Sequence, residues 1–316
     1  MNIPAPAPAQ IARFRRDLEA LAGNSPARLG VAVSGGPDSL ALLLLAAAAF
    51  PGAVQAATVD HQLRPESAGE AAFVADLCAR LGVAHATLRP SEPIRGSLQA
   101  EARRVRYALL DDWREGDGLD WLLTAHHLDD QAETVLMRLN RGAGVAGLSS
   151  VRAINGRVLR PLLGWRRAEL AGIVEAAGIS AVDDSSNADR RFDRVRMRQA
   201  LAESDWLDPG PIARSAAALA EAEDALAWMT DKLLESRVMQ EGEAIQFDAS
   251  GLPAELRRRL VFAILARLGA TALPRGDEVS RLLAALDLGA TATLAGIKCT
   301  GGLPWRFEAA PPRRTS

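Results

Sequence analysis

The first strand-to-helix turn of the chain reads Val31-Ala32-Val33-Ser34-Gly35-Gly36-Pro37-Asp38-Ser39-Leu40. Glycines at such a turn let the backbone approach a ligand closely, and the exposed amides at the start of the helix attract anions. The serine hydroxyls can donate hydrogen bonds to phosphate oxygens. The turn is neither a Walker A loop nor a dinucleotide fingerprint, because it lacks their glycine and lysine patterns. We predict a phosphate-binding loop of another type, with plain helix capping by Asp38 as the alternative.

Strand-like and helical runs alternate around this turn. Four short apolar runs are predicted as strands: Leu29–Val33, Val54–Val59, His85–Leu88 and Trp121–Thr124. Each precedes a longer helical run: Leu40–Phe50, Glu66–Leu81, Ser97–Glu115 and Asp129–Leu139. The alternation predicts an α/β fold with a doubly wound parallel sheet and helices on both faces. Ligands of such sheets bind outside the carboxyl ends of the strands, where the turn lies.

The second half of the chain changes in character. Asn155-Gly156 predicts a β-hairpin, and the run from Arg166 to Ala177 predicts a helix closed by Gly178. After Asp208-Pro209-Gly210-Pro211 the pattern gives long helices and a hairpin-like tail: Ile212–Gln240, Pro253–Leu268, Asp277–Leu286 and Thr291–Glu308. We predict three parts: a lead-in and helix at 1–23, the α/β domain at 24–208, and a smaller, mainly helical domain at 209–316.

Composition limits the class of protein. The 316 residues are 48% hydrophobic and 24% charged, which is typical of a globular chain. The two cysteines, Cys78 and Cys299, form no Cys-x-x-Cys motif, allow at most one disulfide, and indicate a reducing, cytoplasmic compartment. No apolar run reaches the length of a membrane helix. The segment from Met1 to Gln10 alternates proline and alanine and is expected to be a disordered lead-in rather than a secretory signal.

The basic residues are almost all arginines. The formal net charge is −2, and only Lys232 and Lys298 among the 37 basic residues are lysines. The arginines gather in four groups: Arg13, Arg15 and Arg16; Arg103, Arg104 and Arg106; Arg190, Arg191, Arg194, Arg196 and Arg198; and Arg257, Arg258 and Arg259. Compositional bias explains most of the count. Several groups on one surface would form a nucleic-acid footprint.

Histidines and carboxylates follow two of the predicted strands. Asp60-His61 follows the second strand, and His126 follows the fourth with Asp130 four residues later. We predict that His126 and Asp130 meet and move a proton, because a neighbouring carboxylate fixes the tautomer of a histidine or raises its pKa. A structural histidine and an aspartate N-cap are the alternative. His85 is expected to be structural, without a partner.

A metal ion is expected beside the phosphate loop. Asp38 is the predicted ligand of Mg²⁺, which prefers carboxylate and phosphate oxygens. Zinc held by Asp60, His61, His126 and Asp130 is the alternative.

The loop and several later motifs resemble one family. Residues 34–39 resemble the SGGxDS loop of the PP-loop ATPases. Further matches follow in order: Val59-Asp60-His61-Gln62-Leu63-Arg64, Ala125-His126-His127-Leu128-Asp129-Asp130-Gln131-Ala132-Glu133-Thr134, Arg141-Gly142-Ala143-Gly144, Arg160-Pro161-Leu162-Leu163, and Asp183-Asp184-Ser185-Ser186-Asn187 with Arg194-Val195-Arg196-Met197-Arg198. This combination is similar to the tRNA(Ile)-lysidine synthetase family in its short form, and departs from its pattern at Leu128 and Val195.

The resemblance implies a ligase that joins lysine to C2 of the wobble cytidine of tRNA(Ile) with a CAU anticodon. The reaction uses ATP with Mg²⁺, passes through an adenylated cytidine, and changes codon reading from AUG to AUA. The implied partners are that tRNA and free L-lysine, without a membrane; a homodimer is allowed. The implied roles are catalysis by Asp38, His126 and Asp130, metal binding by Asp38, ATP binding by Ser34, Gly35, Gly36, Pro37, Asp38, Ser39, Asp60, Arg194 and Arg198, lysine binding by Glu133, and tRNA binding by Arg103, Arg104, Arg141, Arg190, Arg191 and the 209–316 domain.

Three other functions compete with this one. A PP-loop tRNA 2-thiolase would need a cysteine persulfide or a cluster, whereas Cys78 and Cys299 are isolated. An amidating synthetase would use the same loop. A regulatory module that binds ATP without turnover would leave His126 and Asp130 without a chemical role.

Overall fold

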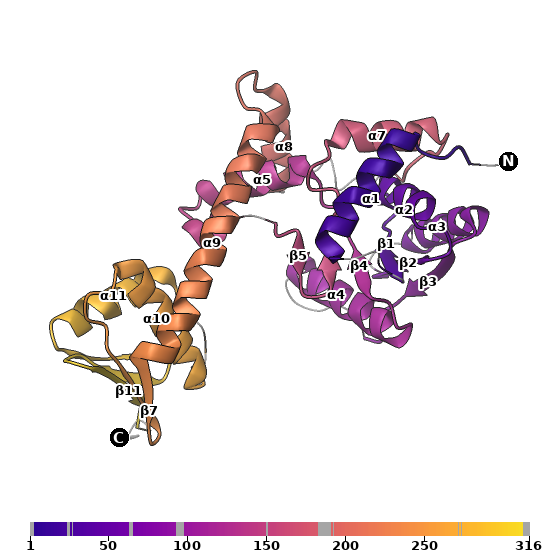
Figure 1. Ribbon diagram of the computed structural model, residues 1–316. Helices are drawn as coiled ribbons and strands as arrows, with labels where there is room; N and C mark the ends of the chain where they lie inside the picture. Colours follow the sequence, from indigo (N-terminus) through magenta and orange to yellow (C-terminus); the bar gives the residue numbers. More distant parts are fainter. Residues whose placement is uncertain are drawn as a thin grey trace. The chain divides into compact units, whose positions relative to one another are not determined.

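The computed structural model describes residues 3–23, 26, 28–62, 66–92, 98–149, 151–182, 191, 193–270, 272 and 274–311. The chain divides into two compact units, Met1–Ala220 and Glu221–Ser316 (Figure 1). Helix α9 (Pro209–Arg237) runs through the division. The composition of the sequence changes at the start of this helix, and that change is why the sequence predicts a domain boundary at 208–211.

The first unit contains the predicted doubly wound sheet. Its strands are β1 (Leu29–Ala32), β2 (Val54–Val59), β3 (Ala84–Leu88), β4 (Trp121–Leu123), β5 (Ile154–Asn155) and β6 (Val158–Leu159), in the order β3-β2-β1-β4-β6-β5. All neighbours pair in parallel except β5 and β6, which form the predicted hairpin around Gly156. β1 pairs with both β2 and β4, so the strand order reverses at β1. Such a reversal opens a crevice at the carboxyl ends of the strands.

Helices cover both faces of this sheet (Figure 1). On one face, α1 (Pro8–Ala22), α2 (Pro37–Ala49), α3 (Ser67–Leu81) and α7 (Arg167–Ala176) share the main core. The leucines of α2 are buried on all sides, which explains the continuous apolar run in the sequence. On the other face, Trp113 of α4 (Leu98–Gly116) lies over β1, and a Cβ on Gly30 would come within 2.8 Å of its ring. Helix α1 begins at Pro8, inside the segment expected to be a lead-in.

Three helices extend this unit beyond the sheet. They are α5 (Leu128–Leu139), the short α6 (Val145–Leu148) and α8 (Asp193–Glu203), and α5 packs against α8. Because α5 starts directly after β4, its first turn lies at the carboxyl edge of the sheet.

The second unit contains more strand than the sequence predicts. It holds the end of α9, then β7 (Val238–Glu241), β8 (Ala244–Phe247), α10 (Ala254–Arg267), α11 (Gly276–Asp287), β9 (Thr291–Leu294), β10 (Ile297–Thr300) and β11 (Trp305–Ala309). The strands form an antiparallel sheet in the order β7-β8-β11-β10-β9. The helix predicted to reach Gln240 ends at Arg237, because Ile245 and Phe247 enter the core through a hairpin that turns at Gly242.

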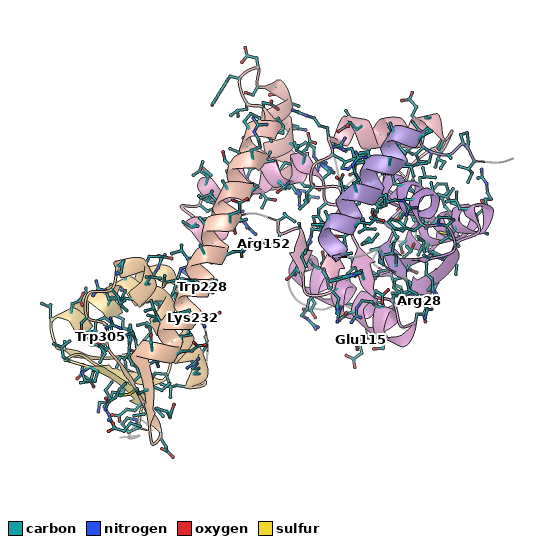
Figure 2. All side chains as sticks on the ribbon, in the orientation of Figure 1. Arg28, Glu115, Arg152, Trp228, Lys232 and Trp305 are labelled. Carbon is teal, nitrogen blue, oxygen red and sulfur yellow. The ribbon has the colours of Figure 1, made fainter. Side chains whose placement is uncertain are left out.

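The core of the second unit gathers around Trp305 (Figure 2). The Trp305 ring meets Phe247 edge to face, with the ring centroids 5.6 Å apart. This arrangement stabilises an aromatic pair beyond the area that it buries. No helix in the described ranges combines the length and hydrophobicity of a membrane span.

Candidate active site

The loop after β1 is held in shape by its own polar atoms. Gly36 caps α2 and Pro37 occupies the first turn, where a missing N–H costs nothing. The Ser39 hydroxyl accepts a hydrogen bond from the Ser34 amide at 3.1 Å and donates one to the Gly36 carbonyl at 2.9 Å. The amides of the first helical turn lack partners within the helix. The loop therefore presents oriented donors at the start of α2, and the binding of an anion there stays a prediction.

Gly35 is required at its position by backbone conformation and by space. Its φ is +84°, a left-handed value that favours glycine. A Cβ at Gly35 would lie 3.1 Å from the Val182 side chain, and the Gly35 carbonyl accepts a hydrogen bond from the Val182 amide at 3.0 Å. The loop is thus anchored to the segment that follows α7.

A cleft of about 790 Å³ opens beside this loop at the carboxyl ends of β1, β2 and β4. It brings together nine of the residues to which the sequence assigns a role: Ser34, Gly36, Asp38, Ser39, Arg103, His126, Asp130, Arg194 and Arg198. Gly35, Pro37, Asp60, Glu133, Arg104 and Arg191 do not line it. Arg190 and the motif from Asp183 to Asn187 lie outside the described residues.

His127 is the histidine that contacts the carboxylates. It is 1% exposed, and its Nε2 lies 3.5 Å from Oδ2 of both Asp38 and Asp130. Its Nδ1 lies 3.6 Å from Asp129 Oδ2. Burial disfavours the charged ring, but the nearby carboxylates of Asp129, Asp38 and Asp130 outweigh it and raise the pKa of His127 to about 9. His127 therefore lies between the phosphate loop and the start of α5, surrounded by three carboxylates.

The sequence predicts that His126 meets Asp130, but in the structure the carboxylates of Asp38, Asp129 and Asp130 lie at His127. His126 Nδ1 forms a 3.1 Å hydrogen bond with Thr124 Oγ1. Burial, followed by the charges of Arg160 and Arg103, lowers the pKa of His126 to about 3. Adjacent residues at a strand end point to opposite sides, and the sequence does not say which side meets the carboxylates. His126 lines the cleft as a neutral ring.

Glu133 is clamped by two arginines. Its carboxylate is 1% exposed and accepts hydrogen bonds from Arg194 Nε at 2.7 Å and Arg198 Nε at 2.8 Å. Arg194 Nη2 also donates to Asp130 Oδ1 at 2.5 Å. The four side chains form one ion-pair network between α5 and α8, and three of them, Asp130, Arg194 and Arg198, line the cleft.

Asp60 organises the loop that follows β2. One carboxylate oxygen accepts hydrogen bonds from Ser67 Oγ at 2.7 Å and the Gln62 amide at 3.0 Å, and the other accepts one from Arg89 Nε at 3.2 Å. The Ser67 hydrogen bond is the main cause that lowers the pKa of Asp60. Its role in ATP binding stays a prediction. His85, expected to have no partner, forms a 3.0 Å hydrogen bond with Thr58 Oγ1.

Asp38 fits a magnesium ion that also binds phosphate. Its Oδ1 is buried, and no donor in the described part of the chain reaches it. A carboxylate oxygen in this state suits a hard cation. Three of the four residues considered for zinc (His61, His126 and Asp130) line the cleft, but the described residues contain no group of three or more His, Cys, Asp or Glu side chains arranged for a metal.

Of three further side chains in the cleft wall, Tyr107 was missed by the sequence, whereas His61 was an alternative zinc ligand and Arg106 was part of an arginine group. His61, Arg106 and Tyr107 line the cleft beside Arg103. Arg106 and Tyr107 follow Arg103 by three and four positions on α4, the spacing that places side chains on one helix face. This helical spacing is the feature of the sequence that could have placed Arg106 and Tyr107 beside Arg103 in the cleft. Arg104 lies off that face and pairs with Glu101 at 2.6 Å.

The sequence of this chain matches a known domain family and is similar to known proteins. Residues 9–204 match the PP-loop domain family. A protein of Novosphingobium aromaticivorans named tRNA(Ile)-lysidine synthase is 48% identical over 96% of this chain and 94% of its own length. The chain belongs to the tRNA(Ile)-lysidine synthase family.

Another member and a more distant structure agree with this assignment. A tRNA(Ile)-lysidine synthase of Zymomonas mobilis is 44% identical over 91% of this chain and 90% of its own length. The structure of the U34-tRNA thiolase NcsA from Methanococcus maripaludis superposes with a TM-score of 0.56 at 16% identity, over 67% of this chain and 79% of its own. At that identity the likeness shows a shared fold. The cleft lies at the carboxyl end of β1, where the strand order of this sheet reverses.

Proposed function

We propose that the chain ligates lysine to C2 of the wobble cytidine of tRNA(Ile) with a CAU anticodon, at the expense of ATP. The observation that carries the proposal is the cleft, in which the loop of residues 34–39, the Asp38 carboxylate and a set of arginines face one space. Membership in the family supplies the reaction type.

In the first step the C2 carbonyl oxygen of the cytidine attacks the α-phosphate of ATP. A bond forms between that oxygen and phosphorus, and the bond to pyrophosphate breaks. The backbone amides of Gly35, Gly36, Asp38 and Ser39 and the Ser34 and Ser39 hydroxyls hold the pyrophosphate. Mg²⁺ bound by Asp38 Oδ1 would neutralise charge on the phosphate oxygens. Single-stranded bases can be splayed out of a loop, which lets the cytidine enter the cleft.

In the second step the ε-amine of lysine attacks C2 and AMP leaves. The lysine ammonium must first lose a proton, and the neutral ring of His126 can accept one. Burial is the largest cause of the low pKa of His126. Arg103, Arg194 and Arg106, which also lower it, line the same cleft, so bound phosphates offset part of their effect. Asp130 orients the amine beside it.

The contacts of Arg194 and Arg198 with Glu133 can couple the binding of ATP to the binding of lysine. Arg194 and Arg198 are the predicted ligands of the nucleotide phosphates, and they occupy both oxygens of Glu133. When they turn to a phosphate, they leave a buried carboxylate without a partner. An ammonium group then replaces them, because a buried charge needs a counter-charge. Lysine therefore binds tightly only after ATP.

The test is transfer of radiolabelled lysine to tRNA(Ile) with a CAU anticodon, in the presence of ATP and Mg²⁺. Wild type should label the tRNA and release AMP only when lysine is present. Asp38→Ala should lose at least 100-fold of this activity, roughly the effect of removing one oriented electrostatic group. Asp76→Ala, on the exposed face of α3, is the matched control and should retain activity. Equal labelling by both variants would contradict the site, and no labelling by wild type would contradict the function.

A further inference from the structure

A second pocket lies on the same pair of helices as the cleft. It has a volume of about 320 Å³ and is lined by Met137, Asn140, Arg141, Asp193, Arg196, Met197 and Ala200. The first two residues belong to α5 or its cap, Arg141 follows directly, and the last four belong to α8. None of the pocket's residues lines the cleft.

The pocket continues a stripe of side chains that begins in the cleft. On α5, Asp130, Glu133 and Met137 are spaced three and four residues apart, so they lie on one face of the helix. Met137 follows Asp130 by about 10 Å along the helix axis. A ligand that extends along α5 from Asp130 in the cleft can therefore reach the pocket, passing over the arginines that cover Glu133.

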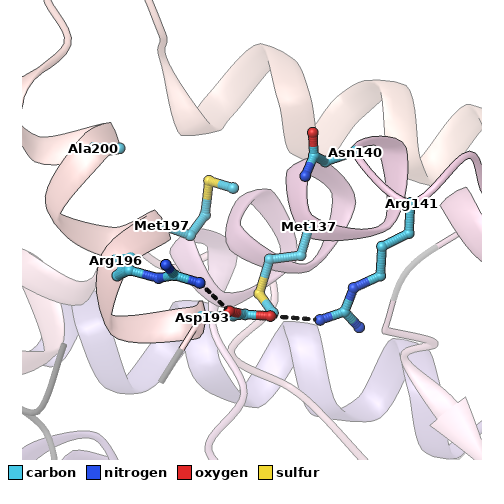
Figure 3. Close-up of a pocket in the computed structure, with 7 residues that line it drawn as sticks. All are labelled: Met137, Asn140, Arg141, Asp193, Arg196, Met197 and Ala200. Atoms are coloured by element: carbon cyan, nitrogen blue, oxygen red, sulfur yellow. Dashed lines mark hydrogen bonds and ion pairs between the residues drawn. The ribbon is translucent and has the colours of Figure 1, made fainter. Parts of the chain in front are cut away.

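The chemistry of the pocket is mixed. Met137 and Met197 are half-buried and provide soft, polarisable surface, which packs well against flat rings. The Asn140 side chain offers both a donor and an acceptor. Figure 3 shows the Asp193 carboxylate between the guanidinium groups of Arg141 and Arg196.

Charge at the rim favours an anion. Arg141 Nη2 pairs with Asp193 Oδ2 at 2.8 Å, and Arg196 pairs with the other oxygen. Two guanidinium groups share one carboxylate, so the trio has a net positive charge. The arginine side chains are 64% and 61% exposed and keep donors available to a phosphate.

We propose that this pocket binds one nucleotide of the RNA substrate next to the nucleotide that reacts, with its base on the methionines and its phosphate on Arg141 and Arg196. The inference rests on the proposed function. A nucleotide of the same RNA loop fits better than free ATP, because the described residues of the pocket include no glycine loop for a triphosphate. A base with one phosphate matches both the apolar floor and the small positive charge.

The test measures binding of full-length protein to an RNA hairpin with a CAU anticodon loop, by fluorescence anisotropy over a range of salt concentrations. Met197→Ala should weaken binding about fivefold without changing the salt dependence, since it removes an uncharged contact. Arg141→Ala should lower the slope of log affinity against log salt by about 1. Asp193→Asn should tighten binding about threefold, because it releases both arginines. Ile154→Ala and Arg80→Ala, exposed residues elsewhere in the first unit, are the matched controls.

The bound nucleotide is identified by placing 2-aminopurine at each loop position in turn. One position should give a fluorescence change that Met197→Ala abolishes and Met197→Leu restores, and an abasic nucleotide there should make binding insensitive to Met197→Ala. Unchanged binding by Met197→Ala, or weaker binding by Asp193→Asn with normal thermal stability, would overturn the proposal. An effect on ATP affinity alone would overturn it in favour of a free nucleotide. Failure of wild type to bind the hairpin or to release pyrophosphate would instead refute the proposed function.

Discussion

Replacing Glu133 by glutamine removes a negative charge from a fully buried position while keeping the shape of the side chain. Two guanidinium groups then face an amide in place of a carboxylate. A hydrogen bond to a charged group contributes about 1.5–3 kcal/mol. Because the side chains of Arg194 and Arg198 are 42% and 28% exposed, water replaces part of that contribution. We expect a loss of about 2 kcal/mol from the free energy of unfolding of the first unit.

For a unit of this size the loss corresponds to a fall in melting temperature of about 4–8 °C. Differential scanning calorimetry of the full chain at neutral pH measures it. Glu115→Gln is the matched control, because Glu115 pairs with Arg114 at 2.9 Å but is 69% exposed. It should shift the transition by under about 1 kcal/mol. In 1 M salt the Glu133→Gln shift should persist, since buried pairs are screened less. Equal shifts for the two variants would refute the reasoning.

Three further predictions concern the loop, the cleft histidine and the thiols. Gly35→Ala should lower the free energy of unfolding by about 1–2 kcal/mol and abolish pyrophosphate release, because φ at Gly35 is +84° and Val182 lies against the new Cβ. Gly172→Ala, at an open helical site, is the control and should raise the free energy of unfolding by about 1 kcal/mol in the same melting assay. His126 has a pKa of about 3 against an ordinary 6.5, so its ring should stay neutral by NMR from pH 7 to 5, and titration near 6.5 would contradict this. Because the unfolded chain binds a proton that the folded chain does not, the free energy of unfolding should fall as the pH drops from 6.5 towards 3. The fall should be less steep in His126→Asn. Cys78 and Cys299 are buried, with burial raising the pKa of each to about 12, so neither should react with a thiol reagent before unfolding, and fast native labelling would reopen the thiolase alternative.

The α/β half follows closely from the sequence. The four predicted strands and their helices occur within a few residues of the expected ranges, because buried parallel strands and amphipathic helices leave distinct periodicities. The phosphate loop was equally readable, since glycine and a helix start are local features. Strands β7 and β8 were missed because short strands separated by charged turn residues resemble a continuing helix.

The partners of each site residue required the tertiary structure. Sequence placed His126, His127 and Asp130 within five positions, but only the fold shows that His127 reaches Asp38 and that His126 turns to Thr124. The clamp on Glu133 joins residues 61 and 65 positions apart. Residue types and spacing fix which groups can do chemistry, because they depend on local bonding. Distances across the sheet edge fix which groups meet and what charge they hold, because electrostatic energy depends on separation and burial.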